Sequence, residues 1–170
     1  MSRFKILLVD DSPNMLKALK RTFKSEGYEL FTVLSAKEAL EVLKKEDIDL
    51  IISDENMPEI SGTELLKLVK VQYPLIIRIM LTGLVNFEVV KNAINKGEIY
   101  RFFNKPWDDF ELLFNVRHAL KQKVLEEENS QLKSNLKQQE KYLRQLEIEY
   151  PGISEKKMSA DGSIIIDSES

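Results

Sequence analysis

Short apolar runs alternate along most of the chain with longer segments in which apolar residues recur at helical spacing. The runs are rich in Ile, Leu, Val and Phe and are too short to be buried helices, so each predicts a strand covered on both faces. The longer segments predict amphipathic helices. The predicted strands occupy residues 4–9, 28–33, 50–52, 75–81 and 99–103.

Residues typical of helix ends lie between these runs. Ser12 before Pro13 predicts an N-cap and a first helical residue, and Gly27 predicts the end of that helix. The spacing of a capping box predicts further starts at Ser35 with Glu38 and at Ser61 with Glu64, and Asp108 with Glu111 opens the fifth helix. The fourth helix is expected to have one apolar face, made of Val85, Val89, Val90, Ala93 and Ile94.

Strict alternation of strands and helices predicts a parallel sheet with helices on both faces. Five such units make a flavodoxin-like, doubly wound α/β domain, for which we expect the strand order 2-1-3-4-5. This domain is expected to span residues 1–122.

The pattern changes near Lys121, because neither Gly nor Pro occurs from there to Tyr150. Residues 123–150 carry an apolar seam of about four heptads, which predicts that the fifth helix continues into a coiled coil. We expect a homodimer through residues 122–150; a lone charged helix folded back on the domain is the alternative. The a positions are Asn129, Leu136, Leu143 and Tyr150, and the d positions are Leu125, Leu132, Gln139 and Leu146.

Asn129 favours a parallel two-stranded coil in a single register, since one polar residue at an a position penalises other arrangements. The only histidine, His118, is expected to be a packing or surface residue near this seam, and Trp107 to cap the base of the fifth helix. Residues 151–170 form a short tail, in which Asp161-Gly162 predicts a hairpin; a disordered tail is the alternative.

Composition narrows the classes of function. The 170 residues include 43% hydrophobic residues and carry a net charge of −3, which argues against direct nucleic-acid binding, because that needs a basic face. The absence of cysteine excludes disulfides and thiolate metal sites. The apolar run near the N-terminus is too short for a signal peptide or a membrane span, so we expect a cytoplasmic protein that does not contact a membrane.

Polar side chains follow four of the five predicted strands. Asp10 and Asp11 follow the first, Asp54 the third, Thr82 the fourth and Lys105 the fifth. Ligands of open parallel sheets bind outside the carboxyl ends of the strands, so these side chains are expected to meet there. Each one alone has an ordinary explanation as a loop or strand-end residue, and it is their convergence that predicts a site.

Three neighbouring carboxylates repel one another unless a cation joins them. Oxygen ligands without His or Cys suit Mg²⁺ or Mn²⁺, and Mg²⁺ readily takes a phosphate oxygen as a further ligand. A carboxylate can itself attack phosphorus and form an acyl phosphate. A lysine and a hydroxyl, here Lys105 and Thr82, then stabilise the charge on the transferring oxygens.

Four segments, LLVDDS, DENMPEISG, IMLTG and RFFNKPWDD, occur in this order and resemble the receiver domain of two-component response regulators, of the chemotaxis-protein type. The resemblance covers roughly residues 3–122. It implies that Asp54 is the phosphoacceptor and that a phosphohistidine on a sensor histidine kinase is the donor. It also implies a Mg²⁺ site made of Asp10, Asp11, Asp54 and the backbone carbonyl of Asn56, with Thr82 and Lys105 contacting the phosphoryl group.

The resemblance further implies a cis peptide bond between Lys105 and Pro106 and a switch formed by Thr82 and Phe102. Phe102 has no hydroxyl to hydrogen-bond when turned inward, and simple core packing is its alternative role. Phosphorylation is expected to change the face made by the fourth helix, the fifth strand and the fifth helix, and with it the dimer and the binding of an unknown downstream protein.

Residues 94–120 resemble receivers found beside cyclic-dinucleotide phosphodiesterases and in hydrogenase-type regulators. The sequence shows no HD-GYP motif, helix-turn-helix segment or ATPase phosphate loop, so we expect no enzymatic activity of its own. One alternative is that the chain is the receiver fragment of such a phosphodiesterase or of a transcriptional activator. Another is a Mg²⁺-dependent phosphohydrolase, which would need a cap and an acid at position 56, where Asn56 stands.

Overall fold

The computed structural model describes residues 3–83 and 87–153. Within them the chain forms a parallel sheet with the order β2-β1-β3-β4-β5, as predicted. The strands are β1 (Lys5–Val9), β2 (Glu29–Val33), β3 (Leu50–Asp54), β4 (Ile77–Thr82) and β5 (Arg101–Asn104). The helices are α1 (Pro13–Thr22), α2 (Ala36–Lys45), α3 (Gly62–Gln72), α4 (Phe87–Asn95) and α5 (Asp109–Glu149).

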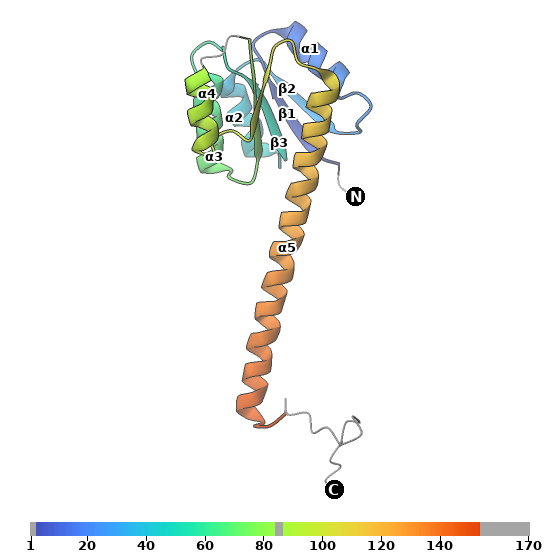
Figure 1. The fold of residues 1–170 in the computed structure, drawn as a ribbon, viewed down its shortest axis with the longest axis vertical. Coiled ribbons are helices and arrows are strands. Elements are labelled where there is room, and N and C mark those ends of the chain that lie inside the picture. The colour runs from blue at the N-terminus through green and yellow to red at the C-terminus, as the bar shows by residue number, and fades with distance from the viewer. Residues whose placement is uncertain (1–2, 84–86, 154–170) are drawn as a thin grey trace. The chain divides into compact units, whose positions relative to one another are not determined.

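Helices cover both faces of the sheet (Figure 1). On one face α1 and the first turns of α5 pack with Leu19 and Val116 against Ile6 and Leu8 of β1. On the other face α2, α3 and α4 pack against alternate residues of the same strands. All five residues of β3 are buried, which explains why its first three, Leu50–Ile52, form a continuous apolar run instead of an alternating one.

Most predicted helix starts are confirmed. Ser12 caps α1 by accepting a hydrogen bond from the N–H of Met15, with Pro13 as the first helical residue. Ser61 and Glu64 form the complete capping box of α3. The box predicted for α2 is only half right, since the Glu38 carboxylate accepts from the N–H of Leu34 instead of that of its N-cap residue.

The end of α1 and the start of β4 are among the boundaries that differ from the predictions. Helix α1 ends at Thr22, and Gly27 instead takes a left-handed φ of 74° in the turns that follow. Strand β4 begins at Ile77, because Leu75 lies outside the sheet with 73% of its surface exposed.

The predicted apolar face of α4 is partly wrong. Val90 and Ala93 are buried, but Val89 and Ile94 are exposed, because α4 touches the core along a narrow stripe. Val85 lies outside the described residues.

Contacts divide the chain into two units, residues 1–122 and 123–170. In the second unit α5 continues as a helix to Glu149, and leucines of the predicted seam such as Leu132, Leu136 and Leu143 are more than half exposed in the single chain. The predicted hairpin of the tail falls on residues 154–170, outside the described part. No helix among the described residues combines the length and apolarity that crossing a bilayer requires.

Candidate functional site

The predicted site residues lie at the carboxyl ends of four strands, at one edge of the sheet. Asp10 directly follows β1, Asp54 is the last residue of β3, Thr82 the last of β4, and Lys105 directly follows β5. The strands are parallel and in a register that pairs Asp54 with Leu81, so their carboxyl ends lie side by side. The backbone N–H of Lys105 donates to the carbonyl of Thr82 at 2.9 Å, which joins the last two of these ends.

Three carboxyl groups gather at this edge. One oxygen each of Asp10, Asp11 and Asp54 lies within 4.8 Å of the others. Asp10 and Asp54 are 1% and 5% exposed, whereas Asp11 faces solvent. A set of hard oxygen ligands, partly buried and open on one side, fits Mg²⁺ with several waters retained.

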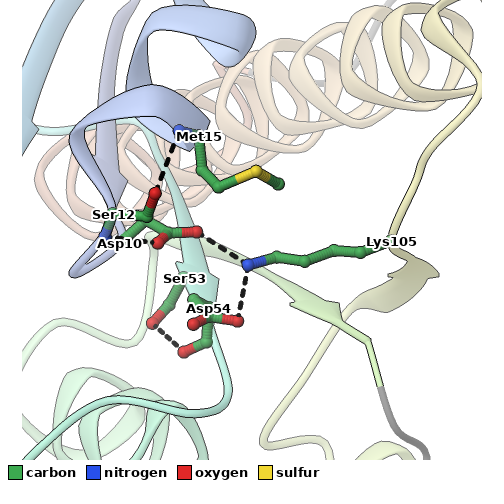
Figure 2. A network of polar contacts seen from close by, with 6 residues as sticks. All are labelled: Asp10, Ser12, Met15, Ser53, Asp54 and Lys105. Carbon is green, nitrogen blue, oxygen red and sulfur yellow. Dashed lines mark hydrogen bonds and ion pairs between the residues drawn. The ribbon is translucent and has the colours of Figure 1, made fainter.

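Lys105 reaches across the edge to two of these carboxylates (Figure 2). Its Nζ lies 2.8 Å from Oδ2 of Asp10 and 2.9 Å from Oδ1 of Asp54. Asp10 is held from the other side, because its Oδ1 accepts from the N–H of Ser12 at 2.9 Å. A single ammonium therefore balances part of the charge of two buried acids.

Burial raises the pKa of Asp54 above its ordinary value, and the charge of Asp10 adds to this. Hydrogen bonds from Lys105 and from the backbone N–H of Asn56 oppose the rise only in part. Burial acts against the charged form of Lys105, but its bonds to Asp10 and Asp54 prevail and raise its pKa. At neutral pH the amine is thus a fixed cation.

The other two predicted residues lie beside this network. Thr82 is 1% exposed at the end of β4. Phe102 of β5 is half-buried and packs against the apolar cluster beneath α2, α3 and α4. The Lys105–Pro106 peptide bond is cis, as the resemblance implies.

Two residues that shape the site escaped the sequence analysis. Ser53, fully buried in β3, donates its hydroxyl to the carbonyl of Asp54 at 2.9 Å. Gly62 lies so close that an added Cβ would stand 2.1 Å from the carbonyl oxygen of Asp54. A hydroxyl inside an apolar strand and a glycine at the first position of a helix were the available signals.

Comparison with known proteins agrees with this arrangement. The family model of the response regulator receiver domain matches residues 6–117. The hydrogenase transcriptional regulatory protein HoxA of Cupriavidus necator is 34% identical over 140 residues, which are 82% of this chain and 29% of that protein. The transcriptional regulatory protein GlrR of Escherichia coli is 37% identical over 117 residues, or 69% of this chain and 26% of that protein.

Among solved structures, the signal receiver domain of an HD domain-containing protein from Pseudomonas fluorescens Pf-5 is 40% identical, with a TM-score of 0.69. The match covers 72% of this chain and 98% of that one. This chain thus matches nearly the whole of a solved receiver domain but spans less than a third of the two curated relatives. On these grounds the chain belongs to the response regulator receiver-domain family and acts in two-component signal transduction.

Proposed function

We propose that Asp54 accepts a phosphoryl group from a phosphohistidine of a sensor histidine kinase. The observation that carries this proposal is the convergence of Asp54 with two further acids and one lysine at a single sheet edge. Within the cluster Asp54 is the acid whose carboxylate also receives the Asn56 N–H, which would hold it in a fixed orientation for attack.

In the transfer, a carboxylate oxygen of Asp54 attacks phosphorus and forms a P–O bond. The P–N bond to the imidazole breaks, and its electron pair stays on the imidazole nitrogen, which takes up a proton. Lys105 moves from the carboxylates to the phosphoryl oxygens, and the Thr82 hydroxyl donates to another of them.

A magnesium ion held by Asp10, Asp11, Asp54 and the backbone carbonyl of Asn56 would neutralise charge on the transferring oxygens. The acidic cluster supports this, since three carboxyl oxygens already lie within reach of one cation. Asp11, being exposed, is the member that a hydrated ion meets first.

The modified Asp54 carries nearly two negative charges, which draw Thr82 and Lys105 towards them. This movement acts on the strand ends next to Phe102, and the half-buried Phe102 side chain would then change rotamer. The face formed by α4, β5 and α5 then changes and alters the binding of a downstream protein.

Residues 1–122 would be the receiver domain and residues 123–150 a parallel coiled coil that joins two copies. Exposed leucines at the a and d positions support the coil, because a lone helix gains nothing by exposing them.

Two alternatives make different predictions. A phosphohydrolase would turn over small phosphoesters, but Asn56 stands where its general acid is needed, so we propose no enzymatic activity for these residues. A receiver fragment of a longer activator or phosphodiesterase retains the same site chemistry, and the greater length of the curated relatives favours this alternative over the first.

Binding of beryllofluoride with Mg²⁺ tests the acceptor. We expect the wild-type chain to bind this phosphoryl mimic, as followed by the fluorescence of Trp107 or by ¹⁹F NMR, and Asp54→Asn to lose binding. Asp49→Asn is the matched control, since Asp49 lies at the other end of β3 and accepts from the N–H of Lys5. Equal binding by Asp54→Asn and wild type would show that the acceptor is another residue.

A further inference from the structure

A buried threonine at the end of α1 is joined by hydrogen bonds to the residues that begin α5. Thr22 is only 9% exposed, and its hydroxyl lies 2.6 Å from Oδ1 of Asp109. The same carboxylate oxygen accepts from the indole N–H of Trp107 at 3.0 Å. This N–H also lies 3.3 Å from the Thr22 hydroxyl oxygen. We call Thr22, Trp107 and Asp109 the indole anchor.

The single proton of the Thr22 hydroxyl has two acceptors in reach. The carbonyl of Ala18 is 3.1 Å away and the Asp109 carboxylate 2.6 Å. A short bond to an ionised carboxylate is the stronger of the two, so the hydroxyl donates to Asp109. Its oxygen can then accept from the indole N–H of Trp107. Each member of the anchor therefore fixes the orientation of the other two.

The indole anchor lies two residues after Lys105 in the chain. On the strand side, the backbone N–H of Lys105 is held at 2.9 Å from the carbonyl of Thr82. Pro106, the next residue, has no N–H and cannot donate a backbone hydrogen bond. The Trp107 side chain follows at once and is held by the anchor. The segment that carries Lys105 is thus attached at both ends.

Packing restrains this segment only in part. One side of Trp107 contacts the apolar cluster beneath α1 and the first turns of α5. A cavity of about 370 Å³ lies towards β5 and Glu111, and Pro106 and Trp107 line it. A second cavity of about 280 Å³ lies towards Met15 of α1, and the same two residues line it. Close-packed interiors leave few such spaces, so the hydrogen bonds of the anchor contribute much of the restraint.

We propose that Thr22 is a positioning residue for phosphoryl transfer, which acts through Asp109 and Trp107 to hold the segment that aims Lys105. The proposal rests on the proposed function, in which the Lys105 ammonium moves from two acids to the phosphoryl oxygens. The Lys105 side chain already reaches those acids in an extended form (Figure 2), so it has little length left to compensate for a displaced backbone. A displacement of about 1 Å can cost about 100-fold in rate.

The affinity for beryllofluoride with Mg²⁺, measured by ¹⁹F NMR, tests the role of Thr22. Thr22→Val keeps the shape but removes the hydroxyl, and we expect it to weaken binding of the mimic about fivefold. Thr22→Ser keeps the hydroxyl and should bind as the wild type does. Thr32→Val is the matched control, because β2 and β5 lie at opposite edges of the sheet. Affinity for Mg²⁺ alone should not fall in Thr22→Val, since an ammonium is not a metal ligand; an equal loss there would contradict the proposal.

Two further variants test whether the effect passes through Trp107 and Lys105. Trp107→Phe removes the indole N–H and should weaken binding of the mimic as much as Thr22→Val does. In a Lys105→Ala background, Thr22→Val should change the affinity by less than about twofold, because the side chain that it positions is gone. A further fivefold loss in that background would contradict a role through Lys105.

The only tryptophan of the chain gives a second measurement, because its indole N–H has a single NMR resonance. Thr22→Val should shift this resonance and speed its hydrogen exchange; an unchanged exchange rate would show that the anchor does not hold the indole in solution. Wild-type affinity in both Thr22→Val and Trp107→Phe would overturn this inference alone. Wild-type affinity in both Asp54→Asn and Lys105→Ala would instead overturn the proposed function.

Discussion

At the scale of single residues, Asp54 is held in a charged form that its position disfavours. It is almost completely buried beside Asp10, and only Lys105 and one backbone N–H favour its ionisation. As the proposed phosphoacceptor, Asp54 must nevertheless be ionised to attack phosphorus. Lys105 binds the carboxylates that a metal ion would also need, so it acts as a substitute charge until a cation or a phosphoryl group arrives.

Replacing Asp54 by Asn should therefore stabilise the domain in Mg²⁺-free buffer, by about 1 kcal/mol at pH 7.5. The pKa of Asp54 is raised on folding, so the folded chain holds this proton more tightly than the unfolded chain does. The advantage of Asp54→Asn is thus complete above the folded pKa and shrinks as the pH falls through it. Urea unfolding at pH 7.5 and at lower pH measures the difference.

A matched control is Glu41→Gln, an exposed change on α2, which should shift stability by less than about 0.5 kcal/mol. A stabilisation by Asp54→Asn that is the same at every pH would show that the effect does not come from the ionisation of Asp54.

At the scale of elements, the junction between β3 and α3 is fixed by the close approach of Gly62 to the backbone of Asp54. The N–H of Gly62 donates to the carbonyl of Glu55 at 3.0 Å, and the Glu55 carboxylate accepts from Thr63 through both its N–H and its hydroxyl. The first turn of α3 is thereby held directly against the backbone of Asp54.

Gly62→Ala should destabilise the domain by about 2–3 kcal/mol, because its Cβ would overlap the Asp54 carbonyl and force the backbone apart. Gly83→Ala is the control, since an added Cβ there would meet no described atom closer than Cβ of Lys105, at 4.0 Å. Thermal and urea unfolding compare the two variants. A Gly62→Ala variant as stable as Gly83→Ala would mean that this close approach does not persist in solution.

Local sequence patterns were sufficient to predict the strands, most of the helix caps and the order of the strands in the sheet. Each of these depends on the periodicity of one segment or on a rule of chain topology, and the convergence of Asp10, Asp54 and Lys105 followed from the same rule. The close approach of Gly62 to Asp54 depends on the path of the loop between them. The pairing of Lys105 with two acids depends on the rotamer of a long side chain. Neither the close approach nor this pairing produces a periodic pattern in the sequence, so neither could be predicted from it.

The end of α1 is another feature that local sequence signals did not predict. Gly27 has the left-handed φ that glycine favours, yet the helix stops at Thr22. The hydroxyl of Thr22 donates to Asp109 at the start of α5, a contact 87 residues away in sequence. Helix ends that depend on such distant contacts are poorly predicted from local signals alone.

At the scale of the whole molecule, the proposed phosphoryl site and the proposed dimer are both connected to α5. Lys105 lies four residues before this helix, and the seam lies along it. If both sites bias the same two arrangements of the chain, their binding free energies are coupled, and the coupling must be equal in both directions.

We therefore expect beryllofluoride with Mg²⁺ to change the dimer dissociation constant by at least about fivefold. Leu132→Lys, which places a charge in the seam, should be monomeric, so it allows the same coupling to be measured from the side of the mimic. The monomeric variant and the dimeric wild type should differ in affinity for beryllofluoride by the factor that the change in the dimer dissociation constant requires. Ser134→Lys is the control, because it adds the same single positive charge at an exposed position of the helix outside the a, d, e and g positions. Equal mimic affinities of monomer and dimer, together with an unchanged dimer constant, would show that phosphorylation is read by another surface and that the coil only holds two independent receivers together.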